Sequence, residues 1–276
     1  MRKDFLDIYT FAKKQGFVVS VFTNGGLLNR AALHCFKEFP PYSIELTMNG
    51  ITPSTYERIS RIPGSYKLAL NSIGKLTKLR FPLVLKANCL QQNLDEIVKI
   101  KHFAEKHIGT HNEGYCFKYD YVIFPRMNGD LLPTRFRLDF NSLSLVRNLD
   151  RDMQREFQRA VRCGLSGAGR DSEYLYHCNS WCDQVCISPQ GRLKFCVFTE
   201  KFSVDLKTND LSQAFRSMRD NILTATYQTN SPCRHCKLRR FCLICPAKSF
   251  LETGNEESPI PFYCEFARRT KMAMPK

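Results

Sequence analysis

The sequence predicts an α/β fold followed by a small cysteine-rich domain. Over residues 1–125, short β-branched and aromatic segments alternate with amphipathic segments of helical period, which is the pattern of a parallel sheet. Beyond residue 175, nine of the chain's 13 cysteines are gathered. We therefore expect two domains, 1–165 and 171–276, joined by a linker in the glycine-rich stretch CGLSGAGRDSE.

The first elements alternate as a βα fold requires. Residues 4–15 predict an amphipathic helix, because their apolar side chains recur at helical spacing and charges lie between them. The segments FVVSVF (17–22) and YSIELTM (42–48) predict buried strands. Thr52 and Pro53 then predict a helix start, with a hydroxyl N-cap and proline at the first helical position.

The later elements continue this alternation. We expect them at 64–79 (helix), 83–89 (strand), 93–107 (helix), 115–124 (strand) and 142–162 (long charged helix). Ser65 is expected to cap the first of these helices. Asn93 and Glu96 resemble a capping box at the start of the second, and Gly109 follows its end.

The clustered cysteines are expected to bind metal. We find no signal peptide and no apolar run long enough to cross a membrane, which predicts a cytoplasmic protein with reduced thiols and no membrane partner. A secreted disulfide scaffold is disfavoured, because such scaffolds are usually short. The four other cysteines are scattered singly, and we expect them to be buried small apolar residues: Cys35, Cys89, Cys116 and Cys163.

The spacing within CRHCKLRRFCLIC (233–245) favours iron–sulfur clusters over zinc. Five residues separate Cys236 from Cys242, whereas a zinc ribbon uses about 15–20 between its knuckles. An iron–sulfur cube is larger and takes thiolates from distant segments. Zinc remains the competing interpretation. The candidate ligands are Cys178, Cys182, Cys186, Cys196, Cys233, Cys236, Cys242, Cys245 and Cys264.

The order of these cysteines resembles the SPASM auxiliary-cluster domain of radical SAM enzymes, such as anaerobic sulfatase-maturing and peptide-modifying maturases. ISPQGRLKFC is similar to that domain's strand–turn–strand hairpin, and CPAKSFLETGNEESPIPFYC to its closing segment. Two features depart from the family: the last knuckle is Cx2C where Cx3C is common, and three cysteines stand at intervals of four where relatives often have one or two.

The resemblance implies two auxiliary 4Fe–4S clusters, each held by four thiolates. One would use Cys178, Cys196 and Cys245, with Cys182 or Cys186 as its fourth ligand. The other would use Cys233, Cys236, Cys242 and Cys264.

The front of the chain resembles the later part of a radical SAM barrel. GFVVSVFTNGGLL is similar to its third strand and following loop, and SIELTMNGITPSTYERISRIPGSYKLALNSI to its fourth strand and helices. This implies an incomplete (β/α) partial TIM barrel that lacks the first strand, the first helix and the second strand. No CxxxCxxC loop occurs in this sequence, and Cys178-Cys182-Cys186 has the wrong spacing. The resemblance therefore implies that S-adenosylmethionine is used only if the missing N-terminal segment is supplied.

Polar residues at the ends of the predicted strands are candidates for a cofactor site, because functional residues of parallel barrels lie at the strand C-termini. By resemblance, Thr23, Asn24, Gly25 and Asn88 would line the S-adenosylmethionine pocket. The competing interpretation is that they are ordinary turn and cap residues. Glu45 and Asp120 are possible proton carriers that the sequence does not distinguish from solvated charge.

Two functions of different class remain. The first is a fragment of a radical SAM/SPASM maturase that modifies a peptide or protein and receives electrons from a donor such as flavodoxin or ferredoxin. The second is a non-catalytic cluster- or zinc-binding module whose basic surface contacts nucleic acid or a partner protein. The net charge of +15 permits an acidic peptide, an anionic small molecule or nucleic acid. Nucleic acid is disfavoured, because aromatic side chains do not interleave with the Lys and Arg residues in a stacking pattern.

Overall fold

The computed structural model describes residues 3–109, 114–148, 154–155, 158–159, 173–177 and 184–273. They form two compact units, of which the first comprises 1–123 and 137–150 and the second 124–136 and 151–276. The predicted linker at 163–173 lies outside the described residues except for its last position. Beyond Asn148 the predicted helix 142–162 also lies mostly outside them.

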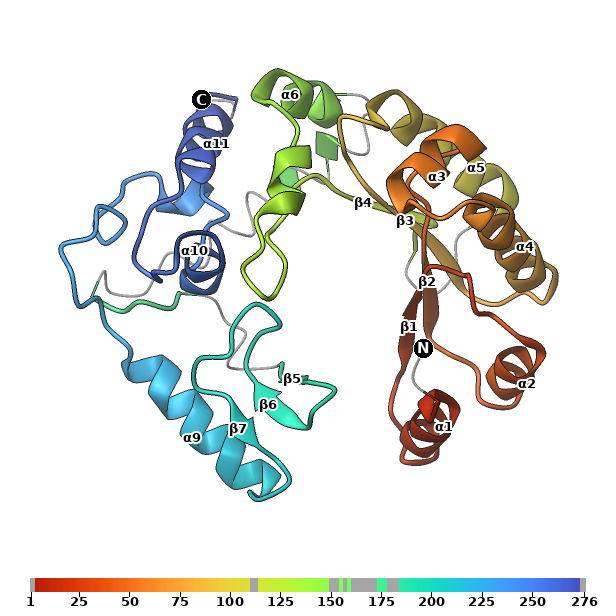
Figure 1. The fold of residues 1–276 in the computed structure, drawn as a ribbon, viewed down its shortest axis with the longest axis horizontal. Coiled ribbons are helices and arrows are strands. Elements are labelled where there is room, and N and C mark those ends of the chain that lie inside the picture. The colour runs from red at the N-terminus through yellow and green to blue at the C-terminus, as the bar shows by residue number, and fades with distance from the viewer. Residues whose placement is uncertain are drawn as a thin grey trace. The chain divides into compact units, whose positions relative to one another are not determined.

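The first unit is built on a parallel sheet, which confirms the predicted α/β class. Its four strands lie side by side in chain order (Figure 1). They are β1 (Ser20–Thr23), β2 (Ser43–Thr47), β3 (Leu83–Asn88) and β4 (Phe117–Asp120). All three pairings are parallel, so that Val21 lies beside Ile44 and Leu85 beside Phe117. Each strand overlaps its predicted segment, although β1 begins three residues after Phe17.

Helices connect these strands, and one of them was not predicted. They are α1 (Phe5–Lys14), α2 (Arg30–Glu38), α3 (Pro53–Ser60), α4 (Ser65–Lys78), η1 (Leu94–Glu96), α5 (Ile97–His107) and α6 (Phe140–Asn148). Helix α2 is the unpredicted element. Its start has a sequence signal, because the side chain of Asn29 accepts a hydrogen bond from the backbone N–H of Ala32 at 2.9 Å.

One of the three predicted helix starts is confirmed and two are wrong. Thr52 is the N-cap of α3 and accepts from the Thr55 backbone. Helix α4 is instead preceded by Gly64 in the left-handed region (φ 77°), so Ser65 is already helical. Asn93 and Glu96 form no capping box. Both side chains are drawn into buried contacts with other segments, which local sequence rules do not include.

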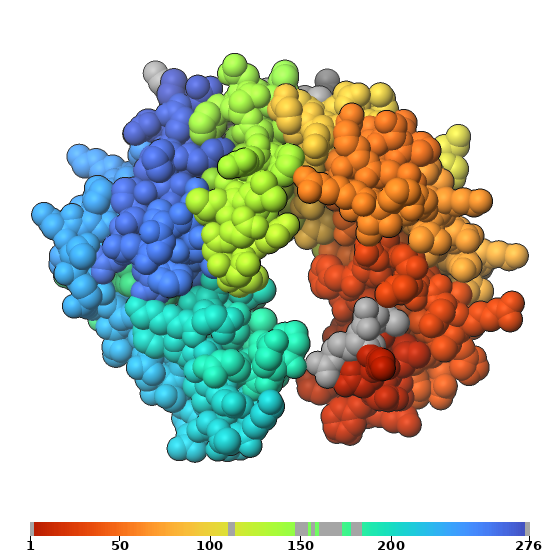
Figure 2. Space-filling model, in the orientation of Figure 1, coloured from red at the N-terminus to blue at the C-terminus, as the bar shows by residue number. Residues whose placement is uncertain are grey.

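The core of the first unit lies on one face of the sheet. The side chains of Ile44, Leu46, Leu83 and Leu85 on that face are fully buried. Helices α4 and α5 contact the strands there, and α3, α4 and α5 lie on the same side of the sheet in Figure 1. Helices α3 and α4 also pack against each other and form a continuous orange surface in Figure 2.

Strand β1 is an edge of this sheet within the described residues. Phe17 and Val18, which lead into it, are 64% and 76% exposed. An apolar sheet edge pairs readily with other chains, and a lysine placed there discourages such pairing. We therefore expect Val18→Lys to reduce self-association, measured by static light scattering against protein concentration. Ile62→Lys, at a loop position that is 56% exposed, is the control. Equal scattering of both variants and the wild type would contradict the prediction.

The second unit combines a small antiparallel sheet with several helices. The sheet contains β5 (Cys186–Ile187), β6 (Arg192–Lys194) and β7 (Val204–Asp205). The helical elements are η2 (Leu132–Phe136), α9 (Leu211–Thr224), η3 (Arg239–Phe241), α10 (Pro246–Thr253) and α11 (Pro261–Met272). The predicted hairpin at 187–196 is confirmed, because β5 and β6 are antiparallel and Gly191 turns between them with φ 83°.

Helix α9 closes the core of the small sheet. Its Met218 and Ile222 are fully buried against Leu193 and Phe195 of the hairpin and against Tyr176. The ring of Tyr176 meets that of Phe195 edge-on at 5.2 Å. No helix in the described part of the chain has the length and hydrophobicity that a membrane span requires.

Candidate functional site

One face of the parallel sheet is polar, and this sets it apart from an ordinary parallel sheet. On this face the ammonium of Lys118 on β4 reaches Glu45 Oε1 on β2 at 2.6 Å. The ammonium of Lys86 on β3 lies 3.0 Å from Asp120 Oδ2 on β4. Strands of parallel sheets are usually apolar on both faces. Two ion pairs across three adjacent strands therefore mark this face as a candidate site.

The ammonium of Lys118 is held in its charged form. Glu45 is only 5% exposed, and the Lys118 ammonium also lies 4.8 Å over the ring of Tyr115. Burial alone would lower the pKa of Lys118, but the hydrogen bonds and charges of Glu45 and Tyr115 outweigh it and raise that pKa. Glu45 and Asp120, which the sequence did not distinguish from solvated charge, are both ion-pair partners on this face.

The turn after β1 places three of the predicted cofactor residues at the C-terminal edge of the sheet. Thr23 Oγ1 accepts a hydrogen bond from the backbone N–H of Gly25 at 3.0 Å, and Asn24 Oδ1 accepts from that of Gly26 at 3.0 Å. Gly25 adopts φ 76°, and a Cβ there would lie 2.9 Å from Leu46 Cδ1. This turn therefore requires glycine. The side chains of Thr23 and Asn24 stabilise the turn, and their contact with a cofactor stays a prediction.

Asn88, the fourth predicted cofactor residue, ends β3 in an asparagine network. Its backbone N–H donates to Asn49 Oδ1 at 2.8 Å. Asn93 Nδ2 donates to the carbonyl oxygens of Asn49 and Asn88 at 2.8 and 2.9 Å, and Asn93 is fully buried. These bonds fix the ends of β2 and β3 relative to each other. The sequence did not indicate Asn93 as the residue that joins them.

Glu96 holds the loop between β2 and α3. Its carboxylate accepts hydrogen bonds from the Ile51 N–H at 2.6 Å and from the hydroxyls of Thr52 and Thr55 at 2.9 and 2.7 Å. Burial alone would raise the pKa of Glu96, but these hydrogen bonds lower it. Glu96 is therefore a buried carboxylate that stays ionised and fixes the loop beside the polar face.

Four of the predicted ligand thiols lie within electrostatic range of one another: Cys233, Cys236, Cys242 and Cys264. Burial, together with the three neighbouring thiols, raises the pKa of Cys242 to about 12 although the Ile244 N–H opposes it. Burial also raises the pKa of Cys233, and Cys264 and Cys236 add to that rise. The described cysteines include no disulfide.

These four thiols suit a metal centre by their chemistry, although their side chains are not arranged as a finished site. Within the described ranges, no three His, Cys, Asp or Glu side chains are placed to hold a metal ion. Four neighbouring thiolates would repel one another, and a positively charged metal centre would remove that repulsion. The donor set therefore fits an iron–sulfur cluster or a zinc ion.

The other predicted ligands lie in separate segments, and their common site stays a prediction. Cys186 begins β5, Cys196 follows β6 and Cys245 precedes α10. Cys178 and Cys182 lie outside the described residues. Among the scattered cysteines, Cys89 and Cys116 are buried as expected and Cys35 is half-buried. Cys163 lies outside the described residues.

Arg239 stabilises the backbone of the first CxxC knuckle, Cys233–Cys236. Its Nη2 donates to the carbonyl oxygens of Cys233 and Arg234 at 2.6 and 2.7 Å, and its Nη1 lies 2.7 Å from His177 Nε2. The guanidinium carbon also lies 5.9 Å from the centre of the Tyr227 ring. Arg239 therefore fixes the backbone that carries two of the thiols.

We expect Arg239→Ala to destabilise the second unit by about 2 kcal/mol, because two backbone carbonyls lose a charged donor. Its metal content after reconstitution should fall as well. Urea unfolding followed by circular dichroism, together with metal analysis, measures both effects. Arg240→Ala is the matched control, because the exposed side chain of Arg240 contacts the Phe241 ring. Equal unfolding midpoints for the two variants would rule out this role for Arg239.

No protein-family profile matches the chain. In sequence, the chain is 22% identical over 288 residues to the AdoMet-dependent heme synthase of Methanosarcina barkeri (strain Fusaro / DSM 804), covering 95% of this chain and 79% of that protein. It is 22% identical over 233 residues to the PqqA peptide cyclase of Rhizobium meliloti (strain 1021), covering 83% of this chain and 58% of the cyclase.

Solved structures resemble nearly the whole chain. Streptococcus suis SuiB bound to S-adenosylmethionine matches with a TM-score of 0.62 and 12% identity, over 95% of this chain and 62% of SuiB. The chain shares the fold of SuiB. Native anSMEcpe with bound AdoMet and the Kp18Cys peptide matches with a TM-score of 0.58 and 14% identity, over 92% of this chain and 72% of that chain. The chain thus has a fold that occurs in structures with bound S-adenosylmethionine.

Proposed function

We propose that this chain is an iron–sulfur protein of the radical SAM/SPASM maturase type, and that it takes part in the modification of a peptide or protein. The observation that carries the proposal is the gathering of Cys233, Cys236, Cys242 and Cys264 in a chain that shares the fold of SuiB. The similarity to a peptide cyclase and to a peptide-bound structure supports a peptide as the substrate.

The residues of the chain would serve this function at two places. The polar face of the partial barrel and its edge at Thr23–Gly25 and Asn88 would hold S-adenosylmethionine and the reacting part of the substrate. The four gathered thiols would hold one auxiliary 4Fe–4S cluster. Cys178, Cys196 and Cys245, with Cys182 or Cys186, would hold the other. Such clusters transfer single electrons when bound, and flavodoxin or ferredoxin would supply them.

The chain by itself is expected to bind S-adenosylmethionine weakly and to release no 5′-deoxyadenosine. Its sequence contains no CxxxCxxC, and a cluster held by four thiolates has no open iron for the cofactor. Equilibrium dialysis with labelled S-adenosylmethionine and product analysis after reduction measure the two properties. Asn88→Ala should weaken binding, whereas Asn221→Ala, at an exposed position of α9, should not.

Adding a CxxxCxxC-bearing βαβ segment, fused or in trans, should start cofactor cleavage. Release of 5′-deoxyadenosine without that segment would mean that one cluster of this chain has an open iron. If the chain neither binds S-adenosylmethionine nor gains cleavage when the segment is added, the proposed function is wrong.

A zinc-binding, non-catalytic module is the second candidate, and the donor set itself favours it. One zinc ion takes four thiolates in tetrahedral geometry, so Cys233, Cys236, Cys242 and Cys264 would suffice without sulfide. Lys237, exposed between the knuckles, would then contribute to a basic surface that contacts nucleic acid or a partner protein. Metal and sulfide analysis separates the two candidates.

A further inference from the structure

The two segments that carry the four gathered thiols are strongly basic. Residues 233–245 and 261–273 contain seven Lys and Arg residues but a single acidic one, Glu265. The first segment contains η3 and the second contains α11, and these two elements pack against each other. The whole chain has 41 basic and 26 acidic residues. The excess of positive charge around the thiols is therefore much larger than the composition of the chain predicts.

Three of these bases carry charge that the chain does not neutralise. Lys237, Arg240 and Lys271 are exposed, and none of them forms an ion pair within the described part of the chain. The guanidinium of Arg240 lies over the ring of Phe241, with 4.8 Å between its carbon and the ring centre, which leaves its charge unpaired. These three charges are thus available to an acidic partner.

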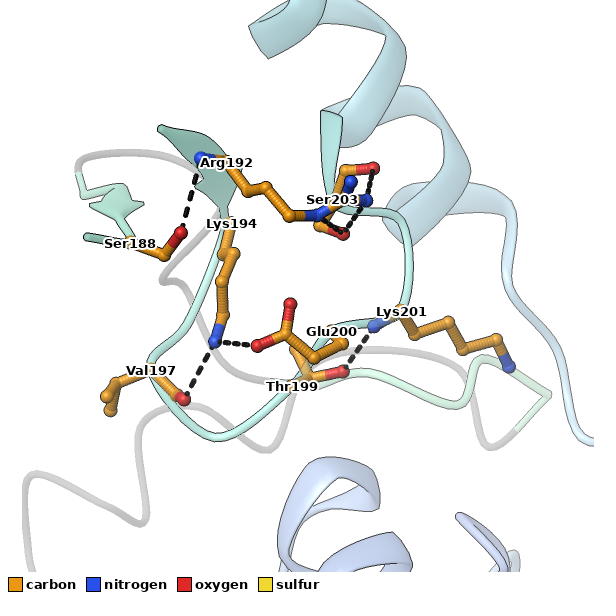
Figure 3. A network of polar contacts seen from close by, with 8 residues as sticks. All are labelled: Ser188, Arg192, Lys194, Val197, Thr199, Glu200, Lys201 and Ser203. Atoms are coloured by element: carbon orange, nitrogen blue, oxygen red, sulfur yellow. Dashed lines mark hydrogen bonds and ion pairs between the residues drawn. The ribbon is translucent and has the colours of Figure 1, made fainter. Parts of the chain in front are cut away.

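Basic side chains of the neighbouring hairpin differ in this respect, because the chain itself uses them. Figure 3 shows the buried ammonium of Lys194 donating to Glu200 Oε1 at 2.6 Å. It also shows Arg192 Nη2 donating to Ser203 Oγ at 2.6 Å. Both residues stabilise the loop after β6. The unpaired bases of the thiol-bearing segments have no such internal role in the described structure.

Helix α11 carries two of the bases on the same face as a thiol. Arg268 follows Cys264 by four residues and Lys271 follows it by seven, and these spacings place all three on one side of a helix. The side chain of Arg268 is 59% exposed and pairs with Glu265 at 2.9 Å. Glu265 also pairs with Arg269 at 2.8 Å, so one carboxylate is shared by two guanidinium groups and the helix surface stays positive.

The thiol group reaches the protein surface at Cys236. This residue is exposed, whereas Cys233, Cys242 and Cys264 are half-buried. Leu243, which follows Cys242, leaves an apolar side chain 38% exposed. Protein interfaces commonly have an apolar centre within a polar rim. An exposed thiol and an exposed leucine on strongly basic segments therefore suit a protein partner.

The aromatic side chains of these segments favour a protein over a nucleic acid. Single-stranded nucleic acids bind basic surfaces by stacking their bases on accessible aromatic rings. Three of the four aromatic residues in the two segments, Phe241, Tyr263 and Phe266, are buried. The surface thus offers positive charge with little to stack on.

We infer that residues 233–245 and 261–273 form the docking surface for an acidic one-electron carrier protein, which contacts the chain over Cys236 and Leu243. The inference rests on the proposed function in taking the four thiols to hold an iron–sulfur cluster. The reduced carrier would lose one electron and the cluster would gain it, with no bond formed or broken and no proton transferred.

This partner fits the surface in two ways. Electron transfer slows steeply with distance, so a carrier needs a place where a ligand of the cluster is exposed, as Cys236 is. Complexes of electron carriers are small and short-lived, and their formation is accelerated by opposite charges on the two surfaces. Unpaired bases around an exposed ligand meet both needs.

The binding test is fluorescence anisotropy with the full chain and a dye-labelled acidic flavodoxin. We expect Lys237→Glu and Lys271→Glu each to weaken binding several-fold, and the double variant to weaken it at least about tenfold. Leu243→Ser should weaken it several-fold without any change of charge. Lys207→Glu is the matched control, because Lys207 is exposed outside both basic segments and the charge change is the same. It should keep wild-type affinity.

The second measurement is the rate at which the reconstituted chain bleaches after mixing with reduced flavodoxin. The double variant should bleach about tenfold more slowly with flavodoxin but at nearly the wild-type rate with dithionite, which needs no docking surface. Circular dichroism of each variant identifies loss of fold.

Equal weakening by Lys207→Glu and by the two surface variants would show attraction by net charge alone and would overturn the inference. Wild-type affinity of Leu243→Ser would also overturn it, as would tighter binding of a labelled single-stranded RNA that the double variant abolishes. The anisotropy assay needs no cluster, cofactor or reductant. It can therefore fail while the metal analysis and the S-adenosylmethionine assays succeed.

Discussion

Reconstituted with iron and sulfide in the absence of oxygen, the chain is expected to bind about eight iron and about eight sulfide ions, as two 4Fe–4S clusters require. Its brown absorbance should bleach with dithionite. Cys242→Ala and Cys264→Ala should each remove roughly half of the iron, because both thiols belong to the same electrostatically coupled group of four. Iron and acid-labile sulfide analysis of the purified variants measures the loss.

Cys35→Ala is the control for this experiment. Its sulfur lies 3.4 Å from the Thr10 hydroxyl in the first unit, so the variant should keep its full iron content. Stoichiometric zinc without sulfide would contradict the cluster assignment and favour the zinc-binding module. Loss of all iron from Cys242→Ala would show that the two proposed clusters do not form independently.

The parts of the fold that were predictable follow from local chemistry. FVVSVF and YSIELTM contain β-branched and aromatic residues that suit buried strands, and alternation with helices implies parallel pairing. Thr52 followed by Pro53 specifies a helix start through a hydroxyl acceptor and a fixed φ. Gly191 provides the left-handed turn of the hairpin. Each of these features depends on a few consecutive residues.

Several of the errors and omissions concern residues whose partners are distant in the sequence. Asn93 and Glu96 have the spacing of a capping box, yet Glu96 binds a loop more than forty residues upstream. Lys118 is an unremarkable base in the sequence but pairs with Glu45 across the sheet. In the second unit, Met127, Phe198 and Phe250 come from separate segments and line one pocket. No local pattern could reveal these combinations, because tertiary packing creates them.

Glu96→Ala is expected to lower the free energy of unfolding of the first unit by about 3 kcal/mol. The substitution leaves two threonine hydroxyls and the Ile51 N–H without their acceptor, and each unsatisfied buried donor costs about 1–3 kcal/mol. Glu96→Gln should cost less, because its amide oxygen still accepts hydrogen bonds. Urea unfolding followed by circular dichroism measures both variants. Glu105→Ala, whose carboxylate pairs with Lys101 on the surface of α5, controls for the loss of a carboxylate.

The same carboxylate predicts how stability depends on pH. Because hydrogen bonds lower the pKa of Glu96 in the folded state below the ordinary glutamate value of 4.5, its contribution is complete above that value. It is then lost as the pH falls through the folded-state pKa. Other carboxylates titrate in this range, so the informative quantity is the difference in unfolding free energy between wild type and Glu96→Gln. That difference should shrink as the pH falls below about 4.5. A difference that stays constant with pH would mean that the charge of Glu96 does not stabilise the loop beside the polar face. The hydrogen bonds alone would then position it.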